Sequence, residues 1–177
     1  MSININNKAK IGTGLGLGLI AMASAFIIDN NLEGLEYTVY KDIVGIDTVC
    51  YGATNNIDKN KVYTLEECNQ LLQKDLDIGN KIIDKNVPNA DEFIPKQTKV
   101  AFISFAFNVG PGRKGVKDGF ATLKSGNKST MLKKLLSGDI EGACYELPYW
   151  NHAGGKYNRG VMNRRIKELR QCLEGLK

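Results

Sequence analysis

The sequence predicts an α+β protein with an uncharged N-terminal segment, then a small β-hairpin region, then a mostly helical lobe. Residues 11–28 carry no charge, residues 37–51 alternate and are rich in Tyr, Val, Ile and Thr, and apolar residues recur at helical spacing after Thr64. Because strands and helices have different periods, the change of pattern separates the two kinds of structure. A chain of 177 residues suffices for one domain with a core and an extension.

The first element is a candidate membrane segment, IGTGLGLGLIAMASAFII, at residues 11–28. Its length is just sufficient to cross a hydrocarbon core of about 30 Å. Lys8 and Lys10 precede it, so residues 1–10 are predicted to stay in the cytoplasm and the rest of the chain to be exported. The segment is rich in Gly and Ala, which add little apolar area, so lipid should hold it only weakly.

Three interpretations of this segment compete. It is a weak, releasable anchor, a cleaved signal peptide with the small-x-small sequence Ala23-Ser24-Ala25, or a conventional anchor that pairs through its glycines. We favour the releasable anchor. Each interpretation places residues 29–177 outside the cytoplasm as one domain.

The hairpin region follows, and Glu33 lies before it at the predicted end of a short helix. If the turn centres on Gly45, Asp42 faces Thr48 across the two strands, with Cβ atoms about 4.5–5.5 Å apart. The turn would therefore bring a carboxylate and a hydroxyl together on one face.

The helical lobe begins at Thr64, which with Glu67 fits a capping box. This helix should end before Pro88 and bury a stripe with steps of three and four residues. The stripe consists of Leu65, Cys68, Leu72, Leu76, Gly79 and Ile83. Further helices are predicted at residues 97–109, 130–136, 140–147 and 158–173, with loops at 110–118 and 151–157.

Charge and cysteine content exclude several classes of function. The net charge of +5 favours an anionic partner, but no Lys/Arg run is interleaved with aromatic residues, so nucleic acid is not predicted as a partner. Four cysteines without CxxC spacing, and His152 as the only histidine, argue against a zinc site and a thioredoxin-type motif. Export favours two disulfides, for which three connectivities are possible, and the alternative is four buried thiols in a cytosolic protein.

Glu33, Asp42 and Thr48 form the candidate catalytic constellation. Glycoside hydrolysis uses two carboxyl groups, one to protonate the leaving oxygen and one on the opposite side of the sugar. A threonine beside the second carboxylate could orient a water molecule. Many proteins contain acid pairs at this spacing, so the plain alternative is an exposed Glu33 and an Asp42 that serves only the turn.

The frame E-G-x5-Y-x-D-x5-T, which begins at Glu33, resembles the Glu/Asp/Thr triad of phage-type lysozymes, glycoside hydrolase family 24. Supporting matches between residues 32 and 172 are Phe107-Asn108-Val109-Gly110, Trp150 with Ala153-Gly154-Gly155-Lys156, and Arg164-Arg165. With its glycine-rich leader, the chain is most similar to the signal-anchor-release endolysins of that family.

The resemblance implies a lysozyme-like fold and hydrolysis of the β-1,4 bond between N-acetylmuramic acid and N-acetylglucosamine in peptidoglycan. Glu33 would be the general acid, and Asp42 and Thr48 would position water, with carboxyl groups more than about 6 Å apart as in inverting enzymes. Asn108 could line the cleft or merely cap its helix. Arg159 is a candidate partner of Glu33 and binder of substrate.

The resemblance also suggests the disulfide pairs Cys50–Cys68 and Cys144–Cys172. The leader contains no cysteine, so control by thiol exchange is excluded, and membrane tethering followed by release and refolding remains. Two positions depart from the family pattern. Ala53 replaces a frequent histidine, and Asp47 replaces a frequent aromatic residue and would add a third carboxylate to the site.

The sequence therefore predicts a monomeric muramidase endolysin, without cofactor or metal, that causes host lysis. It would face the periplasm from the host inner membrane and then be released into the periplasm. Trp150 is expected in the core rather than as a sugar platform, and His152 on the surface. A lytic transglycosylase and a non-catalytic wall-binding module are the alternatives.

Overall fold

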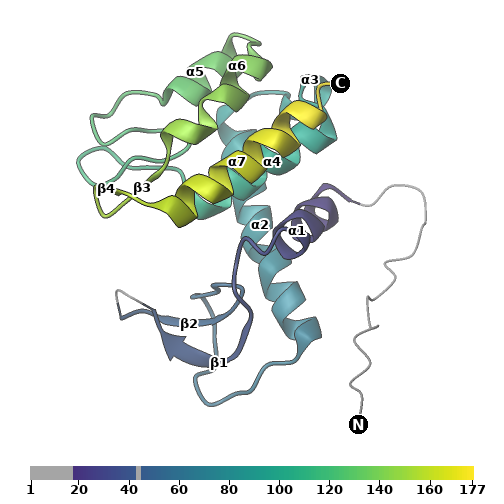
Figure 1. Ribbon diagram of the computed structural model, residues 1–177, viewed down its shortest axis with the longest axis vertical. Helices are drawn as coiled ribbons and strands as arrows, with labels where there is room; N and C mark the ends of the chain where they lie inside the picture. The colour runs from purple at the N-terminus through teal and green to yellow at the C-terminus, as the bar shows by residue number, and fades with distance from the viewer. Residues whose placement is uncertain (1–17, 43–44) are drawn as a thin grey trace.

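The computed structural model describes residues 18–42 and 45–177, which form a hairpin lobe and a helical lobe connected by the long helix α2 (Leu65–Asn86). Helix α1 (Leu19–Asp29) lies beside α2 where the lobes meet (Figure 1). The hairpin lobe contains β1 (Glu36–Lys41) and β2 (Asp47–Cys50). The helical lobe contains α3 (Ala90–Phe93), α4 (Lys96–Val109), α5 (Thr130–Leu136), α6 (Ile140–Tyr145), the 3-10 helix η1 (Leu147–Tyr149), β3 (His152–Ala153), β4 (Lys156–Tyr157) and α7 (Arg159–Glu174).

Helix α2 starts as predicted and buries five of the six residues of the predicted stripe, whereas Leu65 in its first turn is 49% exposed. The Thr64 hydroxyl accepts the N–H of Glu67 at 3.2 Å, and the Glu67 carboxylate accepts the N–H of Thr64 at 2.9 Å, which completes the capping box. Gly79 lies in the buried stripe, where an added Cβ would be 2.9 Å from the Ile103 carbonyl oxygen of α4. The glycine therefore permits close contact between α2 and α4.

Helix α4 is the centre of the helical lobe, and its residues 98–106 are all buried. It packs against α1, α2 and α7. Lys99 is 1% exposed at its N-terminal end, and its ammonium group donates to Asp84 and Asp91 at 2.6 Å each. The buried ammonium group is thus compensated by two carboxylates that are themselves partly exposed.

The hairpin register differs from the predicted one. Thr48 pairs with Tyr40, not with Asp42, and Asp47 pairs with Lys41. Asp42 instead closes the turn, because its carboxylate accepts the N–H of Ile46 at 2.8 Å and its own N–H donates to the Ile46 carbonyl at 3.0 Å. A side-chain cap on the turn thus moves the pairing by two positions, which leaves Asp42 on the same face of the hairpin as Tyr40 and Thr48.

Two disulfides fix this arrangement, and both predicted pairs are confirmed. Cys50–Cys68 connects the end of β2 to the first turn of α2. Cys144–Cys172 connects α6 to the last turns of α7. The first bridge ties the hairpin lobe to the connecting helix, and the second lies within the helical lobe.

Helix α1 is part of the core, although residues 11–28 were predicted as a membrane segment. Ala23 and Ile27 are fully buried and Phe26 is 7% exposed, and the helix contacts both α2 and α4. Within the part of the chain that the structure describes, no helix has both the length and the apolar character needed to cross a bilayer. Residues 1–10 and 11–17 lie outside the described residues.

Candidate functional site

Glu33 is placed by a tight turn directly after α1. Asn31 adopts the left-handed conformation with φ of 47°, and the N–H of Leu32 donates to the Ile27 carbonyl at 3.0 Å, which reverses the chain. The ammonium group of Lys167 on α7 donates to the Asn30 carbonyl at 2.6 Å. The position of Glu33 therefore depends on the docking of α1 and on α7.

Arg164 on α7 is the ionic partner of Glu33. Its Nη1 atom donates to Glu33 Oε1 and also reaches the Leu32 carbonyl at 3.4 Å. The Glu33 side chain is 24% exposed and that of Arg164 is 8% exposed, so the pair is largely shielded from water. Arg159, the partner suggested by the sequence, is exposed at the first position of α7. Helical spacing could have indicated Arg164, which shares a buried face with Glu168 and Cys172.

Behind Arg164, the completely buried Glu168 connects two arginines. Glu168 Oε1 accepts the Nε–H of Arg164 at 3.0 Å and the hydroxyl of Ser104 at 2.7 Å, while Oε2 accepts Nη1 of Arg165. Burial lowers the pKa of Arg165, and the negative charges of Glu168 and Glu33 act in the opposite direction. Two buried cations and two carboxylates thus form one network.

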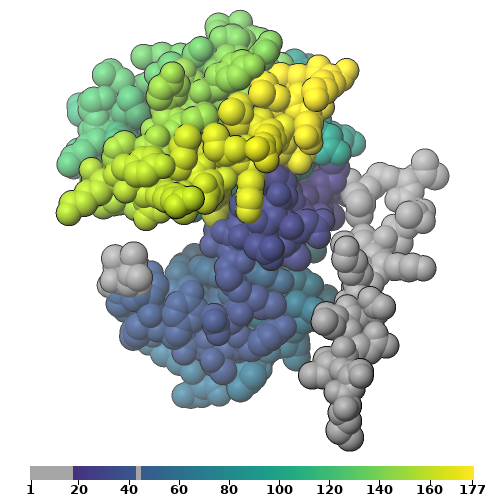
Figure 2. Space-filling model, viewed as in Figure 1, coloured from purple at the N-terminus to yellow at the C-terminus, as the bar shows by residue number. Residues whose placement is uncertain are grey.

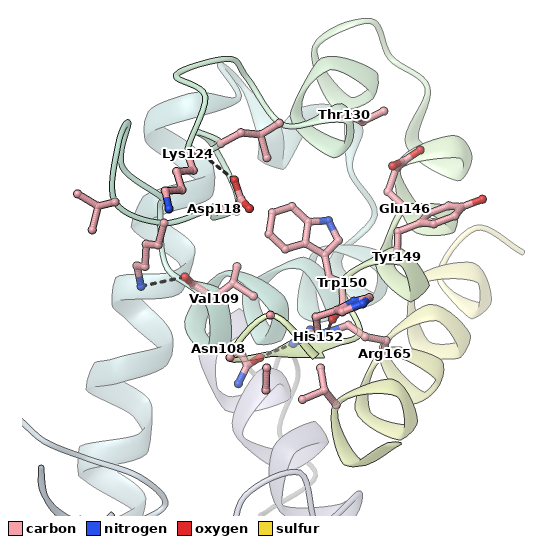
Figure 3. A pocket seen from close by; sticks show the side chains of 17 residues that line it. Asn108, Val109, Asp118, Lys124, Thr130, Glu146, Tyr149, Trp150, His152 and Arg165 are labelled. Carbon is pink, nitrogen blue, oxygen red and sulfur yellow. Dashed lines mark hydrogen bonds between the residues drawn. The ribbon is translucent and has the colours of Figure 1, made fainter. Parts of the chain in front are cut away.

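Arg165 connects this network to a cavity in the helical lobe. Its Nη2 atom donates to Asn108 Oδ1, and its Nε–H donates to the Trp150 carbonyl at 3.2 Å. Asn108 thus holds Arg165 and also lines a cavity of about 970 Å³ (Figure 3). The lining also includes Lys117, Asp118, Lys124, Glu146, Tyr149 and His152.

Trp150 packs against the core, as expected from the sequence, and also lines the cavity. Its ring makes an edge-on contact with Phe105 of the core, with centroids 5.1 Å apart and planes at 78°. The same ring projects into the cavity (Figure 3). Its indole is half-buried, so one edge supports the core while another is open to a ligand.

The second carboxyl oxygen of Glu33 faces the hairpin lobe. A Cβ added to Gly52, in the turn after β2, would lie 3.9 Å from Glu33 Oε2. Gly52 has a φ of +94°, which favours glycine, and the turn approaches the carboxyl group without a side chain of its own. Glu33 is therefore held between Arg164 of the helical lobe and Gly52 of the hairpin lobe. The molecular surface is hollowed between these two lobes (Figure 2).

Asp42 and Thr48 meet at Ile46 in the hairpin lobe. The Ile46 N–H donates to the Asp42 carboxylate, while its carbonyl accepts the Thr48 hydroxyl at 3.1 Å. Thr48 is 4% exposed. The structure thus brings the carboxylate and the hydroxyl together, although through the turn rather than through direct cross-strand pairing.

Asp47 lies on the other face of β2, so it does not add the predicted third carboxylate to the site. It pairs with Lys41 at 2.7 Å and with Lys59, and hydrogen bonds from these two lysines lower its pKa. Ala53, at the other departure from the family pattern, is 4% exposed in the core and exchanges backbone hydrogen bonds with Val49.

The site consists of the Glu33 carboxyl group, which has one oxygen on the Arg164 guanidinium and the other toward the hairpin lobe that carries Asp42. Among residues 18–42 and 45–177, no cluster of His, Cys, Asp and Glu is suited to hold a metal ion. Carboxyl groups can donate and accept protons, and the site offers one on the side of the helical lobe and a second, with a hydroxyl beside it, on the hairpin lobe.

A helical lobe and a hairpin lobe, connected by a long helix and with a carboxyl group held between them, define a lysozyme-like protein. The chain belongs to the phage lysozyme family, whose model matches residues 30–168.

Relatives and solved structures agree with this assignment. The chain is 43% identical over 161 residues to a SAR-endolysin of Bacteriophage PS119, covering 88% of this chain and 87% of that protein. It is 42% identical to a SAR-endolysin of Enterobacteria phage PA-2, with 88% of each chain covered. The active form of the P1 phage endolysin Lyz has a similar fold, with a TM-score of 0.71, 22% identity, and coverage of 93% and 98% of the two chains.

Proposed function

We propose that this protein is a phage endolysin that hydrolyses the β-1,4 bond between N-acetylmuramic acid and N-acetylglucosamine in bacterial peptidoglycan and thereby lyses the host cell. The observation that carries the proposal is the placement of Glu33, with Oε1 on Arg164 of the helical lobe and Oε2 toward Gly52 of the hairpin lobe. The family membership and the names of the relatives support the same activity.

In this proposal Glu33 is the general acid. A neutral carboxyl group can accept the N–H of Arg164 at Oε1 while it carries its proton on Oε2, the oxygen that faces the hairpin lobe. The proton would then pass from Oε2 to the glycosidic oxygen as the bond to the sugar breaks.

Asp42 and Thr48 would hold the attacking water on the opposite side of the sugar. Their shared contact with Ile46 fixes the two groups relative to each other. We expect inversion at the anomeric carbon, because a water molecule between the second carboxylate and the sugar requires carboxyl groups more than about 6 Å apart.

The activity is tested by reducing-end release from purified peptidoglycan. Glu33→Gln should remove most of it, because an amide cannot protonate the leaving oxygen, while Glu36→Gln on the exposed face of β1 should retain it. A folded Glu33→Gln protein that acts at the parental rate would refute the proposal. Mass spectrometry of the products separates hydrolysis from transglycosylation, because anhydro-muramic ends would show the latter.

We further propose that residues 11–28 first act as a weak membrane anchor, with the domain facing the periplasm in a state of low activity. Release would free Leu19–Asp29 to dock as α1, and the soluble enzyme would then reach the wall. The support is that α1 lies directly before Glu33 and buries its apolar side chains against α2 and α4. The names of the relatives agree with this mechanism.

Two truncations test the anchor and the docking separately. A chain without residues 1–17 should be soluble and active, because the buried contacts of α1 come from Leu19 onward. A chain without residues 1–29 should lose both stability and activity, because it lacks α1. Full activity of the shorter chain would show that α1 is dispensable for the site.

A further inference from the structure

Glu168 has no assigned role in the reaction, yet it is the most deeply enclosed carboxylate next to Glu33. It is 0% exposed and accepts hydrogen bonds from Arg164, Arg165 and Ser104. Burying a charged carboxylate costs free energy even when it is paired, because the loss of hydration opposes the attraction between the charges, so its presence here calls for a reason beyond packing.

The reason lies in the balance of charge around the proposed acid. Arg164 and Arg165 are 8% and 0% exposed, and they face two carboxylates, Glu33 and Glu168. The other groups that Arg165 contacts, Asn108 and the Trp150 carbonyl, are neutral. Without Glu168, the two cations would have Glu33 as their nearest carboxylate.

We propose that Glu168 is a positioning residue that neutralises the two guanidiniums and so leaves Glu33 able to carry the proton it donates. The inference rests on the proposed role of Glu33 as general acid. If Glu168 were absent, Glu33 would be held as a carboxylate by two cations, because opposite charges in a poorly solvated site stabilise the ionised form.

Among the charged groups that surround Glu33, Glu168 has the strongest effect on the two arginines. Helix α7 contributes Arg164, with Arg165 and Glu168 behind it. Helix α4 contributes the neutral Ser104 and the turn after β2 contributes Gly52, while the hairpin turn carries Asp42. Glu168 is therefore the carboxylate in direct contact with both guanidiniums.

The test compares three variants by the pH profile of kcat for reducing-end release. Glu168→Gln removes a negative charge, so the basic limb of the profile should move to lower pH and kcat at neutral pH should fall about tenfold. Arg165→Met removes a positive charge, so the basic limb should move to higher pH. The double variant restores the balance, so its limb should return to the parental position.

Opposite shifts that cancel are not expected from a residue that only maintains the fold. If Glu168→Gln does not fold, the comparison of Arg165→Met with the double variant keeps the test, because the added Glu168→Gln should reverse the shift that Arg165→Met causes, and replacing both members of a buried pair is better tolerated than removing one. The matched control is Lys99→Gln, which removes a buried cation and its two ion pairs near the N-terminal end of α4 and should lower stability without shifting the basic limb of the pH profile.

A measurement without substrate separates this inference from the proposed function. Titration of a 13C-labelled Glu33 carboxyl by NMR should show the same two shifts even in a protein that cleaves nothing. If all three variants titrate as the parent does, Glu168 does not set the ionisation of Glu33 and the inference is wrong. If the shifts appear but no reducing ends are released, the proposed function fails alone.

Discussion

Replacing Ile27 by Ala should weaken the packing of α1 against the rest of the fold and so measure how much α1 contributes to stability. Ile27 is 0% exposed on α1, and its carbonyl accepts the Leu32 N–H that turns the chain toward Glu33. Ile→Ala removes three carbon atoms, worth about 0.8 kcal/mol each, and leaves a cavity as well. The expected loss is about 3 kcal/mol, a large part of a total stability of about 5–15 kcal/mol.

The assay is urea unfolding combined with reducing-end release at the same temperature. The matched control is Ile28→Ala, one position along the same helix, where the side chain is 37% exposed and the expected loss is below about 1 kcal/mol. Ile27→Ala should lower the unfolding midpoint and lose activity first when the chain is warmed. Equal midpoints for the two variants would refute the claim that α1 is an integral part of the core.

Three further predictions concern stability. Burial raises the pKa of the Asp75 carboxyl group, which has no polar partner among the described residues. The folded state therefore binds a proton more tightly than the unfolded state, and the free energy of unfolding falls as the pH rises from the unfolded-state pKa through the folded-state pKa. Asp75→Asn should raise the Tm at pH 7 and flatten the dependence of Tm on pH between pH 4 and 7. Gly79→Ala gains about 1 kcal/mol of helix propensity, yet the added Cβ would lie 2.9 Å from the Ile103 carbonyl oxygen. A lower Tm in calorimetry is therefore expected, and a higher Tm would contradict the close contact of α2 and α4. Replacing Cys50 and Cys68 by Ala opens a bridge across a sequence separation of 18 residues and should cost about 3 kcal/mol in urea unfolding, and an unchanged midpoint would show that β2 is held without the bridge.

Local signals in the sequence predicted the helical lobe well. The capping box at Thr64 and Glu67 acts within a few residues, so spacing reveals it. The predicted helix at residues 130–136 coincides with α5, and the one at 97–109 lacks only the first residue of α4. The two disulfide pairs came from the family resemblance rather than from spacing.

Interactions between distant residues were harder to predict. Arg164 and Glu33 are 131 positions apart in the chain, so spacing cannot reveal their pairing, and Arg159 was suggested in its place. The register of the hairpin depended on one side-chain hydrogen bond, from the Ile46 N–H to Asp42, which pattern rules do not include. Both differences arise from contacts made by particular atoms, whereas periodicity describes only faces.

The small residues of α1 affect both its packing in the folded enzyme and its proposed retention in the membrane. Ala23 and Ser24 are buried where the helix meets its neighbours, and small side chains allow that close approach. If the same stretch also rests in lipid before release, larger apolar residues would strengthen its retention there and overpack the folded enzyme. The sequence of this helix is then limited to moderate hydrophobicity, because each added methyl group would both delay release for lysis and distort the folded enzyme.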